Sequence, residues 1–159
     1  MAQRDYTTLD RIDRNILSIL AEEGRISWRD LAERVGLSLT PTLRRIRRLE
    51  EEDYITGYSA RLDESRLGGQ VSVFVSVTLD KQSEDALEVF ETHIAEAPEV
   101  MSCFLMAGGE DYLLRVVAED LPSYQAFMTG FLTRIPGVAR IHSSFALKSV
   151  IRRAAPPLK

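Results

Sequence analysis

Four arginines lie within a five-residue stretch in the first third of the chain: Arg44, Arg45, Arg47 and Arg48. A guanidinium group can bind a phosphate, or the O6/N7 edge of guanine, through two parallel hydrogen bonds. Thr40 and Thr42 lie just upstream, and their side chains can bind phosphate through the hydroxyl group or contact a thymine methyl group through the methyl group. The cluster therefore indicates a surface that binds nucleic acid. The alternative is a solvated helix face whose arginines form salt bridges.

The positive charge is local. The chain of 159 residues has a net charge of −4, and residues 1–60 contain ten arginines and eleven acids, a net of −1. Residues 61–159 contain ten basic and thirteen acidic residues, a net of −3, so neither half is basic. Residues 40–49 hold four arginines and no acid, whereas acids occupy all of residues 50–53. A broad positive field is therefore excluded. Whether the arginines bind nucleic acid has to be decided from the geometry of the segment that carries them.

The residues before this stretch have helical spacing. Apolar residues at 12, 16, 19 and 20 repeat at three- and four-residue steps, which places them on one face of a first helix. Asp10 and Asp13 at its start form an acidic variant of a capping box. Gly24 can end the helix in a left-handed conformation. We therefore predict a capped amphipathic helix before the arginine stretch.

Two more helices follow at short intervals. Ser27 can cap a second, short helix, and Gly36 can close it. Ser38 or Thr40 can cap the third, which extends to about Asp53. Three short helices with a glycine-containing turn before the third are typical of a helix-turn-helix, whose second motif helix enters the major groove of double-stranded DNA.

The third helix has one apolar side and one basic side. At about 100° per residue, Leu43, Ile46 and Leu49 share the side that faces the other two helices. Arg44 and Arg48 lie opposite as candidate base readers, flanked by two arginines placed to contact phosphate. The N-terminus of this helix also attracts phosphate. The predicted DNA contacts are therefore Ser38, Thr40, Thr42, Arg44, Arg45, Arg47 and Arg48.

The second half of the chain has a different period. Alternating valines predict a strand over residues 71–79, and a helical pattern follows over 83–97. Strands are predicted at 100–107, 112–118 and 138–150, with a second helix at 121–134. This order is typical of a ferredoxin-like βαββαβ domain with both helices on one sheet face. The predicted fold class is α+β, with a winged-type helix-turn-helix unit in which residues 54–58 form a short extended segment.

The predicted organisation has four parts. Residues 1–58 form the DNA-binding unit, 59–69 a linker made flexible by Gly68 and Gly69, 70–150 the ferredoxin-like domain, and 151–159 an extended tail. The sheet face opposite the helices needs a cover, and the chain has no further segment to supply one. A partner subunit is the economical solution, so we expect an obligate homodimer.

Composition excludes several classes of protein. The longest apolar runs fall short of the ~18–20 residues that span a bilayer, and residues 1–10 carry no apolar signal core, so we expect a cytoplasmic protein. A single cysteine, Cys103, excludes an intramolecular disulfide framework and a cysteine-rich zinc site. Its apolar neighbours predict a buried thiol. We expect no cofactor and no metal.

Two other functions have to be weighed. An enzyme would need a catalytic group, but His93 falls on the apolar face of a predicted helix and His142 in a strand, neither beside a nucleophile. Glu110 and Asp111 are adjacent in sequence, which is not the opposed arrangement that acid–base pairs need. We therefore expect that the protein is not an enzyme. A metabolite-sensing interaction module without DNA binding would need apolar groups on the exposed face of the third helix, where arginines lie instead.

Eight motifs follow one another along the chain: Leu9–Leu17, Gly24–Ser27, Leu31–Ser38, Thr40–Glu50, Ile55–Tyr58, Gly108–Leu114, Ile135–Val138 and Ser143–Lys148. This ordered series resembles the Lrp/AsnC (feast/famine) family of transcriptional regulators. The resemblance implies a helix-turn-helix joined to a ferredoxin-like regulatory domain that dimerises through its sheets and often assembles to octamers.

The resemblance also implies a binding site for a small effector, usually an amino acid, near the loop after the second strand of the regulatory domain. In this chain the corresponding residues are Ala107, Gly108, Gly109, Glu110, Asp111 and Tyr112. We expect Asp111 to pair with the effector ammonium and backbone N–H groups near the glycines to hold its carboxylate. Family members often carry Gly-Asp-x-Asp here, so one expected acid is missing. A plain hairpin turn is the alternative.

Overall fold

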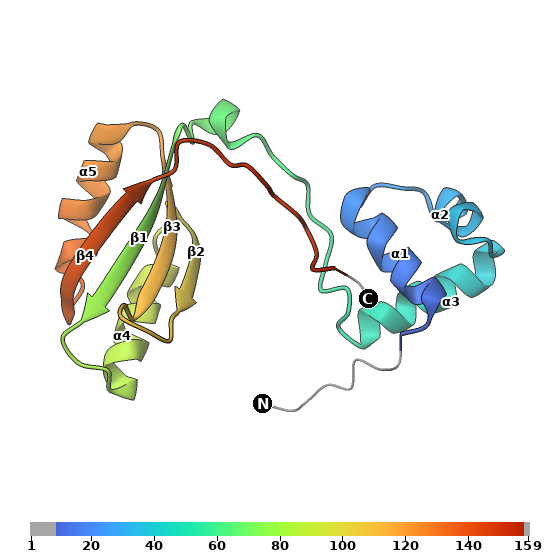
Figure 1. Ribbon diagram of the computed structural model, residues 1–159, viewed down its shortest axis with the longest axis horizontal. Helices are drawn as coiled ribbons and strands as arrows, with labels where there is room; N and C mark the ends of the chain where they lie inside the picture. Colours follow the sequence, from blue (N-terminus) through green and yellow to red (C-terminus); the bar gives the residue numbers. More distant parts are fainter. Residues whose placement is uncertain (1–8, 158–159) are drawn as a thin grey trace. The chain divides into compact units, whose positions relative to one another are not determined.

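The computed structural model describes residues 9–157, which fall into two compact units. One unit contains the chain up to Arg61 together with the segment from Ile151, and the other is Leu62–Val150 (Figure 1). Most of the polar N-terminal segment and the last two residues of the predicted tail lie outside the described residues. No helix within residues 9–157 is long and apolar enough to cross a membrane.

The N-terminal unit has the three predicted helices, α1 (Arg11–Glu22), α2 (Trp28–Val35) and α3 (Leu39–Glu51). The predicted capping box of α1 is present, with Asp10 and Asp13 each accepting from the other's backbone N–H. Ser27 caps α2, and Gly36 closes it with a φ of 72°. Gly24 directly follows Glu23, the cap residue of α1, but its φ is not positive, so the predicted left-handed end is absent. The three short helices expected of a helix-turn-helix are therefore all present.

A small core joins these helices. Its fully or nearly buried members are Ile16, Leu20, Ile26, Leu31, Ile46 and Leu49. The predicted extended segment at residues 54–58 forms no strand, and Tyr54 and Ile55 instead pack against this core. The Tyr58 hydroxyl donates to Glu50 at 2.9 Å, and its ring lies edge-on to that of Trp28. This segment therefore holds the end of α3 against the rest of the unit.

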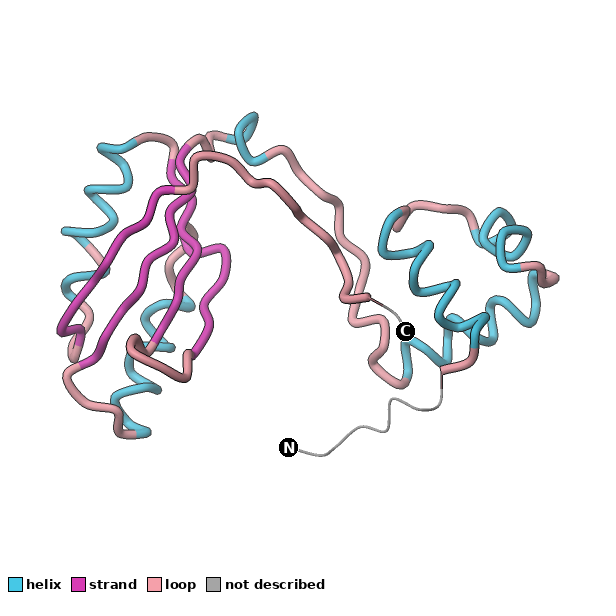
Figure 2. The backbone as a smooth tube through the Cα atoms, in the orientation of Figure 1, coloured by secondary structure: helices cyan, strands magenta, loops and turns pink. Residues whose placement is uncertain are grey.

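The second unit is the predicted ferredoxin-like domain. Its elements are β1 (Val71–Leu79), α4 (Glu84–Ala95), β2 (Val100–Leu105), β3 (Tyr112–Ala118), α5 (Leu121–Gly130) and β4 (Val138–Phe145). The four strands form one antiparallel sheet in the order β2-β3-β1-β4, and both long helices lie on the same face (Figures 1 and 2). The final predicted helix is divided into α5 and a short 3₁₀ turn at Leu132–Arg134, and the last strand stops before residue 150.

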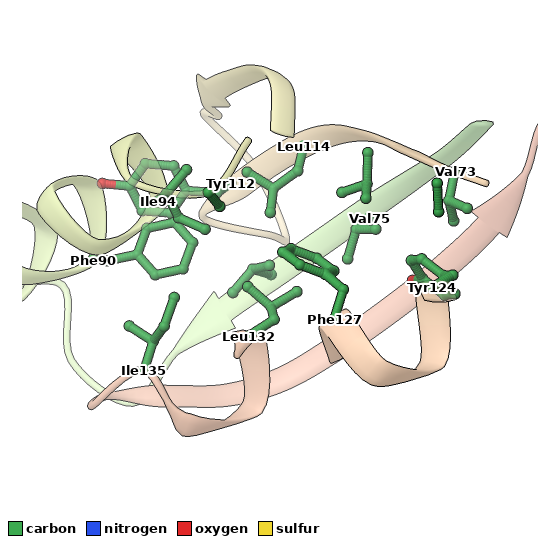
Figure 3. Close-up of a cluster of buried hydrophobic side chains, with 14 of the residues drawn as sticks. Val73, Val75, Phe90, Ile94, Tyr112, Leu114, Tyr124, Phe127, Leu132 and Ile135 are labelled. Atoms are coloured by element: carbon green, nitrogen blue, oxygen red, sulfur yellow. The ribbon is translucent and has the colours of Figure 1, made fainter. Parts of the chain in front are cut away.

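Alternation along the central strands builds the core of this domain. Val73, Val75 and Val77 of β1 are completely buried and face the helices, where aromatic side chains from α4 and α5 pack on them (Figure 3). Strand β3 alternates in the same way, with Leu114 and Val116 buried. Cys103 was predicted to be buried and is exposed, because β2 is an edge strand.

The opposite sheet face carries large apolar groups that neither helix covers. We call it the open face. It consists of the even-numbered residues of β1, the residues of β3 and β4 paired with them, and the residues of β2 that pair with those of β3. Phe74 is 42% exposed and lies opposite Arg115 of β3, and Phe104 is 56% exposed and lies opposite Leu113. The predicted need for a cover on this face is therefore met by no segment within residues 62–150.

Residues 62–69 are more ordered than the flexible linker that the glycines predicted. Glu64–Leu67 form a 3₁₀ helix, and the Glu64 carboxylate accepts two hydrogen bonds from Arg115 of β3. Gly68 ends the 3₁₀ helix with a φ of 88°. Gly69 then approaches β3 so closely that a Cβ there would meet Val117 Cγ1 at 2.6 Å. These glycines are required by local geometry, and the segment belongs to the regulatory unit.

We predict that Gly69→Ala lowers the free energy of unfolding of the regulatory unit by about 1–3 kcal/mol, because a methyl group would overlap the stiff, β-branched Val117. Urea denaturation measures the loss. Gly130→Ala is the matched control, since nothing lies within 4 Å of its added methyl group. An unchanged midpoint for Gly69→Ala would show that this approach is not tight.

Candidate DNA-binding helix and effector loop

The exposed face of α3 carries two of the four arginines. Arg44 and Arg47 are exposed, as are Ser38 and Thr40 at the start of the helix. The Ser38 side chain makes no capping hydrogen bond. A shallow hollow runs along this face, lined by Thr40, Leu43, Arg44, Arg47, Arg48 and Glu51. All six residues belong to one helix, so the hollow is a surface that can be pressed against a partner and not an enclosed pocket.

The buried side of α3 differs from the prediction by one position. Thr42, Ile46 and Leu49 are the buried residues, whereas Leu43 is only half-buried. Thr42 has no exposed surface, and its hydroxyl donates to the Ser38 carbonyl at 3.0 Å. Thr42 was predicted to contact DNA, and this is wrong for the helix as folded, because its side chain faces the interior.

The other two arginines are held by acids of α1. Arg45 Nη1 lies 2.8 Å from Asp13 Oδ1 and 2.7 Å from Asp10 Oδ2. Arg48 Nη2 bonds the second oxygen of Asp13. The alternative of salt-bridged arginines therefore holds for Arg45 and Arg48, since acids distant in sequence reach them. The hydrogen bonds that Arg45 donates to Asp13 and Asp10 raise the pKa of Arg45. The pKa of Asp10 is lowered, mainly by the Asp13 backbone N–H and also by Arg45.

Sequence reasoning placed Asp13 only in the helix cap and missed its second role. Asp13 is completely buried, together with Ile16 and Leu20 on the same side of α1. These residues are three and seven positions apart, which is the spacing of a buried helix stripe. An acid on such a stripe needs a charged partner, so the spacing contained a usable signal.

The predicted effector loop divides into an exposed part and a buried part. Residues 107–110 are exposed, and a Cβ at Gly108 or Gly109 would meet no atom within 4 Å. Asp111 is only 6% exposed, and its carboxylate accepts from the Leu79 backbone N–H at 2.7 Å and from Gln82 Nε2 at 2.6 Å. Both oxygens are engaged within the domain. The carboxylate of Asp111 thus ties the loop to the end of β1, and its pairing with an effector ammonium stays a prediction.

Tyr112 was also predicted to contact the effector, but it is 1% exposed. Its hydroxyl donates to Glu91 of α4 at 2.7 Å, and its ring packs on Phe90 with the centroids 4.5 Å apart. Burial and the neighbouring Glu91 carboxylate raise the pKa of Tyr112 well above its usual value. Tyr112 thus anchors the loop to the core, and the reachable part of the predicted site is Ala107, Gly108, Gly109 and Glu110.

Both units match known domain families. Residues 9–56 match the winged helix-turn-helix DNA-binding domain, and residues 72–156 match the Lrp/AsnC ligand binding domain. The chain belongs to the Lrp/AsnC family. The chain is a DNA-binding transcriptional regulator that responds to a small effector, as the paired domains of the family specify.

Named relatives of this Lrp/AsnC regulator cover nearly its whole length. It is 68% identical over 150 residues to the Bkd operon transcriptional regulator of Pseudomonas aeruginosa, covering 94% of this chain and 98% of that protein. It is 45% identical over 136 residues to the leucine-responsive regulatory protein of Escherichia coli, covering 86% and 83%.

Solved structures agree with the fold of this Lrp/AsnC regulator. A transcriptional regulator of Neisseria meningitidis in complex with L-methionine has a TM-score of 0.90 at 35% identity, covering 94% of this chain and 97% of that one. An AsnC family regulator of Agrobacterium tumefaciens has a TM-score of 0.88 at 38% identity, with the same coverage.

Proposed function

We propose that this Lrp/AsnC regulator reads its operator with the exposed face of α3. The observation that carries the proposal is the exposure of Arg44 and Arg47 on the recognition helix of a helix-turn-helix unit. Ser38 and Thr40 at the helix N-terminus are placed to bind phosphate. Thr42, Arg45 and Arg48 are engaged inside the unit. We infer no catalytic role for any of these residues.

Genome-wide mapping of bound DNA, followed by footprinting on one recovered fragment, tests this function. A dimer presents two recognition helices, so we expect two protected half-sites separated by about one helical turn of DNA, roughly 10 base pairs, or a multiple of it. Binding without any enriched sequence would contradict sequence-specific regulation and favour the interaction-module alternative.

We propose that the effector is an α-amino acid with an apolar side chain. Two relatives support this class: one is named for its response to leucine, and another was solved with L-methionine. The exposed loop at residues 107–110 supplies peptide N–H groups suited to a carboxylate. Glu110 is the exposed acid beside them, so it replaces Asp111 as the proposed partner of the ammonium group.

Calorimetry with each standard amino acid tests the effector proposal. We expect leucine or methionine to bind, and Glu110→Gln to weaken that binding roughly tenfold or more, the effect of losing one charged hydrogen bond. Glu119→Gln removes an equally exposed acid outside the loop and should leave affinity unchanged. If no amino acid gives heat or stabilises the protein, the loop is only a turn.

We further propose that two copies pair through the open face to form a homodimer, and that dimers assemble further, to octamers. The exposed Phe74 and Phe104 on the open face support the dimer. Exposed apolar side chains outside that face, at Met101, Leu105 and Leu121, support contacts between dimers. The size of the assembly is measured by sedimentation velocity.

A further inference from the structure

A buried acid lies between the first helix and the recognition helix. Asp13 of α1 has no exposed surface, and its two oxygens contact guanidinium groups of α3 that are 32 and 35 residues away in sequence. Asp10 adds a second carboxylate on Arg45. Two carboxylates thus face two guanidinium groups, so the cluster is neutral within itself.

The cluster restrains the two arginines unequally. Arg45 bonds both acids, and its side chain is 24% exposed. Arg48 bonds Asp13 alone and is 40% exposed, and its Nε is buried with no hydrogen-bond partner among the described residues. A carboxylate left unpaired in the interior would be costly, so the fold favours keeping both arginines on Asp13.

Two features set how α3 is turned about its own axis. Burial of Thr42, Ile46 and Leu49 fixes its apolar side. The bonds of Arg45 and Arg48 to Asp13 add a second restraint toward α1, and Arg44 and Arg47 lie on the exposed face. Asp13 therefore separates the bonded arginines of residues 44–48 from the exposed ones.

We propose that Asp13 is a positioning residue that sorts the four arginines of α3 into a structural pair, Arg45 and Arg48, and a DNA-contacting pair, Arg44 and Arg47. The proposal rests on the proposed DNA-binding face of α3. Asp13 raises the specificity of binding by keeping two mobile cations away from phosphates, where they would add affinity for any sequence.

The first test is Asp13→Asn, with binding measured to a mapped operator duplex and to a mixed-sequence duplex of equal length. Arg48 is released to a phosphate, so the slope of log affinity against log salt on the mixed duplex steepens by about 0.9. The ratio of specific to non-specific affinity falls about tenfold as α3 loses its orientation. A merely structural role would weaken both duplexes without steepening the slope, and that result would overturn the proposal.

Glu22→Gln is the matched control, because it removes one negative charge from an exposed position of α1 outside the cluster. Specificity and salt slope should then stay close to those of the unmodified protein. A fall in specificity as large as that of Asp13→Asn would assign the effect to the loss of any negative charge on α1 and contradict the proposal.

A second variant keeps the proposal testable if Asp13→Asn does not fold. In Asp13→Leu/Arg45→Met/Arg48→Met the whole cluster is replaced by apolar groups, an exchange that buried ion pairs often tolerate. If Arg45 and Arg48 do not contact DNA, the salt slope on the operator is unchanged. A slope reduced by about 0.9 or more would mean that this pair contacts phosphates. Failure of the unmodified protein to bind any mapped duplex would instead refute the DNA-binding proposal itself.

Discussion

Replacing Arg44 and Arg47 together by alanine is expected to lower affinity for a mapped operator by roughly 10²–10⁴-fold, since each contact that reads a base contributes about 1–3 kcal/mol. Both side chains are exposed on one face of α3 and lie along the same hollow. Neither takes part in the acid cluster that holds Arg45 and Arg48. Fluorescence anisotropy at one fixed salt concentration measures the loss.

The single variants separate the roles of the two arginines. An arginine that reads a base should change the base preference at one operator position when it is removed. An arginine that contacts phosphate should instead weaken all sequences alike and reduce the salt slope by about 0.9. Competition with operator variants that differ at single positions distinguishes these outcomes.

A charge-matched control is available in the regulatory unit. Lys81→Ala/Arg134→Ala removes the same two positive charges from exposed positions outside the helix-turn-helix. Operator affinity should change by less than about threefold, because neither side chain belongs to the unit that carries α3 and salt screens interactions between exposed charges. Equal losses of operator affinity in the two double variants would show that net charge governs binding and that the arginines of α3 make no specific contact.

Phe74→Lys is expected to convert the proposed dimer to a monomer, raising its dissociation constant by about 100-fold or more. Phe74 lies on a central strand of the open face, opposite Arg115 and Ser144 of the neighbouring strands. A lysine buried there in a dimer would be desolvated and would repel the nearby guanidinium group. Sedimentation equilibrium measures the dissociation constant, and circular dichroism establishes that the variant is folded.

The same variant should lose operator affinity, although it leaves α3 untouched. Two linked recognition helices bind a two-part site far more tightly than one, because the second helix binds at a high effective concentration. In a net-acidic chain this linkage matters more than in a basic one, since no broad positive field assists binding.

Val89→Lys is the matched control for this experiment. Val89 is 40% exposed, close to the 42% of Phe74, but it lies on α4, which covers the other sheet face. We expect this variant to stay dimeric and to bind the operator normally. Dissociation by Val89→Lys with none by Phe74→Lys would place the interface on the helices and refute pairing through the open face.

Much of the fold could be predicted from the spacing of apolar residues along the chain. The alternation of valines over residues 71–79 defines β1 with the correct bounds, and the helix caps at Asp10 and Ser27 are where their residue types indicate. Such signals are local, because a strand or helix repeats within a few residues. The order within the linker was less well predicted. Gly68 has a positive φ and Gly69 lies close to β3, and no local sequence pattern indicates either requirement.

The candidate sites show the same division. Residue types alone indicated the recognition helix, because arginines and hydroxyl groups at a helix start are an uncommon local combination. The candidate effector loop came from the resemblance to the Lrp/AsnC family, since glycines between strands by themselves also fit a plain turn. Which of those side chains are available was decided only by tertiary structure. Asp13 takes Arg45 and Arg48 from 32 and 35 residues away, and the β1 end engages Asp111 across a similar separation. A charged group's partner depends on distance in space, and the chain order does not contain that distance.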